Sequence, residues 1–82
     1  MRIPRGISGR ELAKKLEHYG YHISRQTGSH IRLTTEQGGE HHITIPDHKE
    51  LRVGTLSAIL ADIADHIETS KEDIIEALWG NK

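Results

Sequence analysis

The sequence has no cysteine and no phenylalanine, and its 82 residues include only two tyrosines, one tryptophan and two prolines. Without cysteine the chain has no disulfide, no thiol nucleophile and no zinc site built on thiolates. Because aromatic residues are so few, the core has to be built from Ile, Leu, Val and Ala. A chain of this length forms one small core, so we expect a single domain over residues 1–82.

Long apolar runs are also missing. No segment approaches the ~20 apolar residues that a membrane-spanning helix needs. The charged residues at the start of the chain are not followed by an apolar stretch, so we expect no secretory signal. These absences predict a cytoplasmic protein without membrane contact.

Acidic and basic residues nearly balance, with a net charge of −1 at pH 7. Their distribution is uneven. Residues 1–55 carry nine Lys/Arg against six Asp/Glu, whereas residues 56–82 carry two against six. This asymmetry indicates a basic working surface and an acidic remainder, although solvated charge without a role explains it as well.

The first helix is predicted between Ser8 and Gly20. Ser8 and Glu11 have the spacing of a capping box, in which the serine hydroxyl accepts a hydrogen bond from the amide three residues on. An apolar stripe follows at helical spacing, and Gly20 is a suitable stop because glycine adopts the left-handed conformation without penalty. The stripe consists of Leu12, Leu16 and Tyr19.

Three short segments then alternate between apolar and polar residues, at 21–25, 30–34 and 41–45. Short turns separate them, which predicts an antiparallel three-stranded meander. Alternation places one set of side chains on the buried face: Tyr21, Ile23, Ile31, Leu33, Ile43 and Ile45. The open face receives His22, Ser24, His30, Arg32, Thr34, His42 and Thr44.

Two helices complete the chain. One follows Gly54, with Thr55 as a possible cap, and the other begins at Thr69 or Ser70 and ends at Gly80. The fold class is therefore α+β, an α-β-β-β-α arrangement with a three-stranded antiparallel sheet and an extra C-terminal helix. The first two helices cover one sheet face. The third packs on the second helix or offers Trp79 to a partner.

Four blocks occur in the order of a known family. They are Ser8-Gly9-Arg10-Glu11-Leu12, Gly28-Ser29-His30, Pro46-Asp47-His48 and Gly54-Thr55-Leu56-Ser57-Ala58-Ile59-Leu60. In these blocks the sequence resembles the HicA (YcfA-like) family. The resemblance implies a fold like that of double-stranded-RNA-binding domains, and it implies the toxin of a type II toxin–antitoxin system. Such a toxin is a metal-independent endoribonuclease acting on mRNA, neutralised by a HicB-like antitoxin, with His30 as its catalytic residue.

The residues around His30 suit this chemistry. RNA carries its own nucleophile, the 2′-hydroxyl, so an enzyme without a metal needs a base and positive charge around the phosphate. Histidine titrates near neutral pH and suits the base. Arg25 and Arg32 are candidates for phosphate contact, as are the amides of the turn at Gly28 and Ser29. From spacing alone, the simpler interpretation of His30 is one exposed histidine among seven.

Further candidates for RNA contact lie outside this turn. His48 precedes the second long helix and could orient His30 or supply a proton, although a loop histidine bonded to nearby backbone explains it as well. The other candidates are Lys49 and, on the first helix, Arg10, Lys14 and Lys15; a solvated helix face is their alternative. A non-catalytic RNA-binding module of the same fold and a protein-interaction role for the acidic C-terminal helices remain alternative functions.

Histidine is frequent enough to raise a metal hypothesis. His22, His30 and His42 share the predicted open face, and three histidines can bind zinc. His41 and His42 point to opposite faces of one strand and cannot bind one ion together without a bulge. A ladder of polar side chains on a solvated sheet is the simpler interpretation, so we predict no metal and no cofactor.

Overall fold

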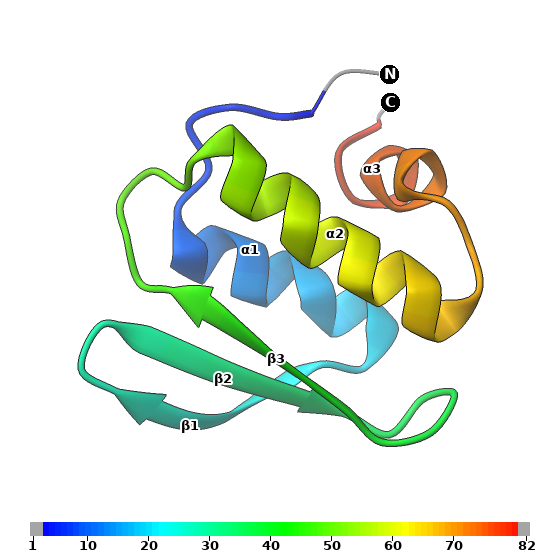
Figure 1. Ribbon diagram of the computed structural model, residues 1–82, viewed down its shortest axis with the longest axis horizontal. Coiled ribbons are helices and arrows are strands. Elements are labelled where there is room, and N and C mark those ends of the chain that lie inside the picture. The colour runs from blue at the N-terminus through cyan, green and yellow to red at the C-terminus, as the bar shows by residue number, and fades with distance from the viewer. Residues whose placement is uncertain (1–2, 81–82) are drawn as a thin grey trace.

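The computed structural model describes residues 3–80 and has two layers, with the helices on one face of a three-stranded sheet (Figure 1). The elements in chain order are α1 (Gly9–Lys15), a 3₁₀ turn η1 (Leu16–Tyr19), β1 (His22–Thr27), β2 (His30–Thr35), β3 (His41–Pro46), α2 (Val53–Ile67) and α3 (Lys71–Trp79). This confirms the predicted α+β arrangement with its extra C-terminal helix. Residues 1, 2, 81 and 82, at the ends of the predicted domain, lie outside the described residues.

The first helix begins and ends where its local signals predict. The Ser8 hydroxyl accepts a hydrogen bond from the Glu11 amide at 3.0 Å. The last turn tightens into η1, and Gly20 ends it with a left-handed φ of 81°. Leu12 and Leu16 are fully buried, so the predicted stripe faces the core.

The sheet has the order β1-β2-β3 with both pairs antiparallel. The β1–β2 turn contains only Gly28 and Ser29, because Thr27 pairs directly with His30. Gly28 has a φ of 55° at the first central position, which is what a type II′ hairpin turn requires of that residue. The turn thereby fixes the register that puts His30 at the start of β2.

One residue predicted for the buried face is not buried. Tyr21, Ile31, Leu33, Ile43 and Ile45 lie in the core, but Ile23 is 48% exposed. Ile23 lies in an edge strand, and the register shifts between Ile23 and Arg25 through a β-bulge at Ser24. The edge position explains the exposure, since no neighbouring strand and little of the helical layer covers that side of β1.

The start of α2, the first of the two C-terminal helices, differs from the prediction. α2 begins at Val53 with Arg52 in the N-cap position, so Thr55 lies inside the first turn and its assignment as a cap is wrong. The preceding Leu51 is buried and donates its amide to Ile7 at 2.7 Å, and this contact sets where the chain turns into the helix. α3 is capped by Ser70, as expected, and packs on α2. Within residues 3–80, no helix combines the length and the apolar character needed to cross a membrane.

Candidate active site

His30 lies at one end of the sheet, on the face that no helix covers. It follows the turn at 28–29, and its register partners are Thr27 in β1 and Pro46 in β3. Along β2 the neighbouring Ile31 is buried whereas His30 is exposed, so the imidazole belongs to the opposite, open face. A substrate can therefore reach this ring without any rearrangement of the fold.

Two arginines share that face next to His30. Arg32 is two residues further along β2, and Arg25 is its register partner in β1. Strict alternation from Ile23 would turn Arg25 toward the helices, but the bulge at Ser24 adds one residue and re-aims the side chain. Within residues 3–80 neither guanidinium has an ion-pair or hydrogen-bond partner. Like charges directly opposite one another are unfavourable, and an anion bound between them would relieve the repulsion.

Asp47 ties three elements together beside this site. Its amide donates to the carbonyl of Ser29 at 2.7 Å, which joins the loop after β3 to the turn before His30. Its carboxylate accepts from Arg10 of α1 at 3.2 Å and from Gln26 of β1 at 3.1 Å. The turn that carries His30 is thus held from both sides, and preorganisation of this kind is what a catalytic group needs.

The same loop touches the N-terminus of α1. The carbonyl of His48 accepts the Gly9 amide at 2.9 Å, and a Cβ on Gly9 would overlap the carbonyl oxygen of Pro46. The side chains of His48 and Lys49 are exposed and form no hydrogen bond within the described part of the chain. His48 therefore contributes to the fold through its main chain, and its imidazole stays available in the loop beside the β3 end.

The cations of α1 are unequal as candidates for RNA contact. Arg10 is paired with Asp47, and Lys15 donates its ammonium to the carbonyl of Leu78 at 3.0 Å, in the last turn of α3. A cation at a helix C-terminus is favourable because carbonyls and the helix dipole present negative charge there. Lys14 is exposed and lies one turn from Arg10 on the same side of the helix. Two of the three predicted contacts are thus engaged within the protein.

The register excludes the metal site considered from the sequence. His22 and His42 both flank Thr34, whereas His30 is four residues away along β2 and pairs with Pro46. At ~3.3 Å per residue, His30 is about 13 Å along the strand from the row of His22 and His42, too far for the three rings to bind one ion. Across residues 3–80, no group of three His, Cys, Asp or Glu side chains is arranged to hold a metal ion.

A partly buried hydrogen-bond network on the helical side was not predicted. The Tyr21 hydroxyl bonds to Nδ1 of His41 at 2.6 Å, and Nε2 of His41 lies 3.2 Å from the Asp62 carboxylate of α2. Burial raises the pKa of Tyr21 to about 12, and the charge of Asp62 adds to the shift. The His66 ring stacks on His41 and bonds through Nε2 to carbonyls of the β2–β3 turn. From the sequence, the one indication of this network is the hydroxyl of Tyr21, which needs a hydrogen-bond partner when the ring is buried. The sequence does not show which residues supply that partner.

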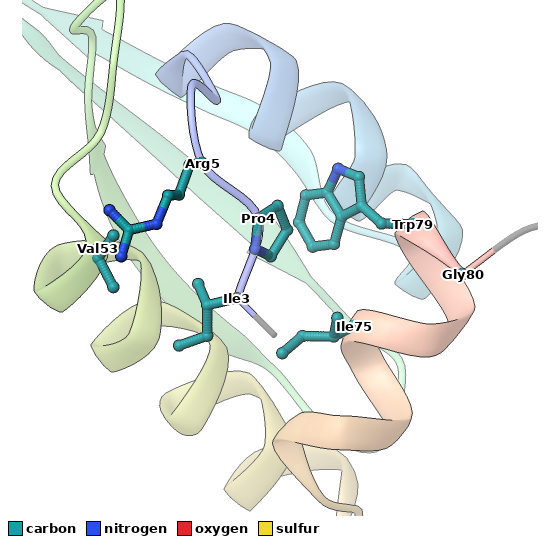
Figure 2. Close-up of a pocket in the computed structure, with 7 residues that line it drawn as sticks. All are labelled: Ile3, Pro4, Arg5, Val53, Ile75, Trp79 and Gly80. Carbon is teal, nitrogen blue, oxygen red and sulfur yellow. The ribbon is translucent and has the colours of Figure 1, made fainter. Parts of the chain in front are cut away.

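A cavity on the helical side of the molecule is not lined by His30. It measures about 700 Å³ and opens between the N-terminal segment, the start of α2 and the end of α3 (Figure 2). Its lining is mostly apolar and contains no histidine and no carboxylate: Ile3, Pro4, Arg5, Val53, Ile75, Trp79 and Gly80. Arg5 is the one charged residue in this lining, so the cavity offers no base for proton transfer.

Comparison with known proteins identified a family match over most of the chain. The family model described as HicA toxin of bacterial toxin-antitoxin matches residues 9–64, which run from the first residue of α1 into the last turn of α2 and include both the sheet and the 47–49 loop. α3 and most of the cavity lining fall outside the match. No curated protein matches the sequence, and no solved structure matches it either.

Proposed function

This chain belongs to the HicA toxin family of bacterial toxin–antitoxin systems, and we propose that it is a metal-independent endoribonuclease that cleaves mRNA with His30. Membership of the family makes it the toxin of a pair and implies an antitoxin as its partner. The antitoxin is proposed to be HicB-like and to neutralise the toxin by covering the open face around His30. The protein is proposed to act in the cytoplasm, where mRNA is found.

The observation that carries this proposal is the presence of two arginines near the exposed ring of His30. The exposed imidazole of His30 lies two residues from Arg32 along β2, and Arg25 of β1 is opposite Arg32. No carboxylate from residues 3–80 is paired to either guanidinium. A base next to unpaired positive charge is the minimum that cleavage at a phosphodiester requires. The amides of the turn at 28–29 add donors at the same end of the sheet.

In the proposed reaction His30 takes the proton from the 2′-hydroxyl as the 2′-oxygen attacks the adjacent phosphorus. The bond from phosphorus to the 5′-oxygen breaks, and that oxygen receives a proton, for which His48 is the candidate donor. The products are a 2′,3′-cyclic phosphate and a 5′-hydroxyl. Arg25 and Arg32 bind the scissile phosphate and stabilise the charge that builds up on its oxygens in the transition state.

The test is single-turnover cleavage of single-stranded RNA in EDTA by the wild-type protein and by His30→Ala. General base catalysis is typically worth ~10²–10⁴-fold, so the variant should lose activity by at least about a hundredfold. His18→Ala is the matched control, because His18 is also exposed but lies in η1 on the helical layer. Equal cleavage by His30→Ala and wild type would refute the catalytic assignment. RNA binding without cleavage by the wild type would favour the non-catalytic RNA-binding module instead.

A further inference from the structure

The three strands contain no aspartate and no glutamate, although the chain has twelve acidic residues. We infer that the open face of the sheet is a binding surface for single-stranded RNA, with the strand running along β2 from His30 past the arginine pair to His22 and His42. This inference rests on the proposed function for its ligand. It adds the path of the RNA, which the site itself does not specify.

The open face is built of three rows that cross the sheet. The register gives the first row as Thr27, His30 and Pro46, the second as Arg25, Arg32 and Thr44, and the third as His22, Thr34 and His42. Successive rows are two residues apart along a strand, which is ~7 Å. That spacing is similar to one nucleotide step of an extended strand, so neighbouring rows can meet neighbouring nucleotides.

Charge complementarity favours a polyanion on this face. The second row carries two unpaired guanidinium groups, and the acidic residues of the C-terminal third lie in the helical layer and the turns that join its helices: Asp62, Asp65, Glu68, Glu72, Asp73 and Glu76. The two acidic residues that directly flank β3, Glu40 and Asp47, are both engaged. Glu40 lies 2.8 Å from Nε2 of His42, and Asp47 is bonded to Gln26, whose register partner Ile31 is on the helical side.

The third row is ordered for contact with bases. Thr34 lies between the two histidines, and its hydroxyl bonds to Nδ1 of His42 and to the hydroxyl of Ser24, both at 2.8 Å. These bonds fix the His42 ring at the surface, and His22 is exposed across the strand. Unstacked bases bind on planar side chains such as histidine and arginine, which is how single-stranded RNA is recognised and a paired duplex is not.

The alternative path over α1 is less well equipped. Of its three cations, Arg10 and Lys15 are already bonded within the protein, to Asp47 and to the carbonyl of Leu78. Only Lys14 is left without such a partner among residues 3–80. RNA that used Arg10 and Lys15 would therefore have to replace their bonds within the protein, whereas binding to Arg25 and Arg32 on the open face breaks no such bond.

The experiment measures binding of a short fluorescent 2′-O-methyl RNA by anisotropy over a series of salt concentrations. This probe lacks the 2′-hydroxyl, so binding is measured whether or not the protein cleaves RNA, and cleavage by the His30 variant is tested separately. Arg25→Gln and Arg32→Gln should each weaken binding about tenfold and lower the salt slope by about 0.7. The double variant His22→Gln, His42→Gln should weaken it about five- to tenfold.

His18→Gln is the matched control and should change affinity less than about twofold, whereas Lys14→Gln tests the alternative path over α1 and should weaken binding less than either arginine variant. All the substituted side chains are exposed, so the folded state of each variant is checked by its urea midpoint. The inference is overturned if Lys14→Gln weakens binding and the open-face variants do not, if the matching duplex binds more tightly than the single strand, or if the wild type binds no RNA. If the open-face variants weaken binding as expected while His30→Ala still cleaves RNA, the inferred RNA path is supported and the catalytic assignment of His30 is refuted.

Discussion

Replacement of Gly9 by alanine should destabilise the protein and loosen the loop that holds the turn before His30. Gly9 is buried at the first position of α1, where its amide donates to the carbonyl of His48 at 2.9 Å. An added Cβ would overlap the carbonyl oxygen of Pro46 and lie 3.3 Å from Cγ2 of Ile45. The overlapping atom is backbone, so no side-chain rotation can relieve it, and α1 has to move away from the end of β3.

The magnitude follows from three contributions. Overpacking at a well-packed position costs about 1–3 kcal/mol, and the lost hydrogen bond to His48 adds about 1 kcal/mol. The higher helix propensity of alanine returns about 1 kcal/mol. The net loss of unfolding free energy is about 2 kcal/mol, and with an m-value of about 1 kcal/mol/M this lowers the urea midpoint by about 2 M.

Gly54→Ala supplies the matched control. Gly54 also lies in the first turn of a helix, but a Cβ there meets nothing within 4 Å. That substitution should leave the urea midpoint unchanged or raise it, by up to about 1 kcal/mol in unfolding free energy. Both variants are measured by urea denaturation followed by circular dichroism. Equal midpoints for Gly9→Ala and the wild type would show that α1 does not approach β3 as closely as described.

Three further results are expected. If His30 is the base as proposed, Asp47→Ala should lower kcat for RNA cleavage about tenfold with little change in KM, because the turn that carries His30 loses its link through Asp47 to Arg10. A change in KM alone would contradict this positioning role. The pKa of Tyr21 is raised to about 12 from an unfolded value near 10, so its contribution to stability, about 2–3 kcal/mol, is present below pH ~10 and lost as pH rises toward 12. Tyr21→Phe should therefore flatten the alkaline fall in urea midpoint relative to wild type, and parallel curves would argue against the buried hydroxyl. Ile23→Val should leave stability within about 0.5 kcal/mol whereas Ile31→Val should cost about 1 kcal/mol, and comparable losses by urea denaturation would mean that Ile23 is buried after all.

Much of the fold could be predicted from the sequence because its signals are local. The capping contact at Ser8, the cap at Ser70 and the two-residue turn at Gly28 each depend on residues within three positions of one another. Alternation in the strands placed His30 and Arg32 on the open face. These features are set by backbone geometry near each residue, and long-range packing did not override them.

The features that were missed depend on contacts between distant residues or on a change of register. The bulge at Ser24 has no local signal in the sequence. Ser24 and Arg25 are both polar, so the pattern of apolar and polar residues does not show that the strand contains an extra residue there. Lys15, a candidate for RNA contact, also bonds to the end of α3, 63 residues away in sequence, and no local signal predicts that bond. The role of Asp47 depends on a partner 37 residues away. No periodicity or spacing rule carries that kind of information.

The chemical identity of the cleaved ends tests the central claim most directly. The wild-type protein is incubated with a single-stranded RNA in EDTA, and the products are analysed by mass spectrometry. If the open-face imidazole of His30 activates the 2′-hydroxyl, the upstream fragment carries a 2′,3′-cyclic phosphate and the downstream fragment a 5′-hydroxyl. A 3′-hydroxyl with a 5′-phosphate would show that water attacks the phosphorus, and it would contradict the mechanism.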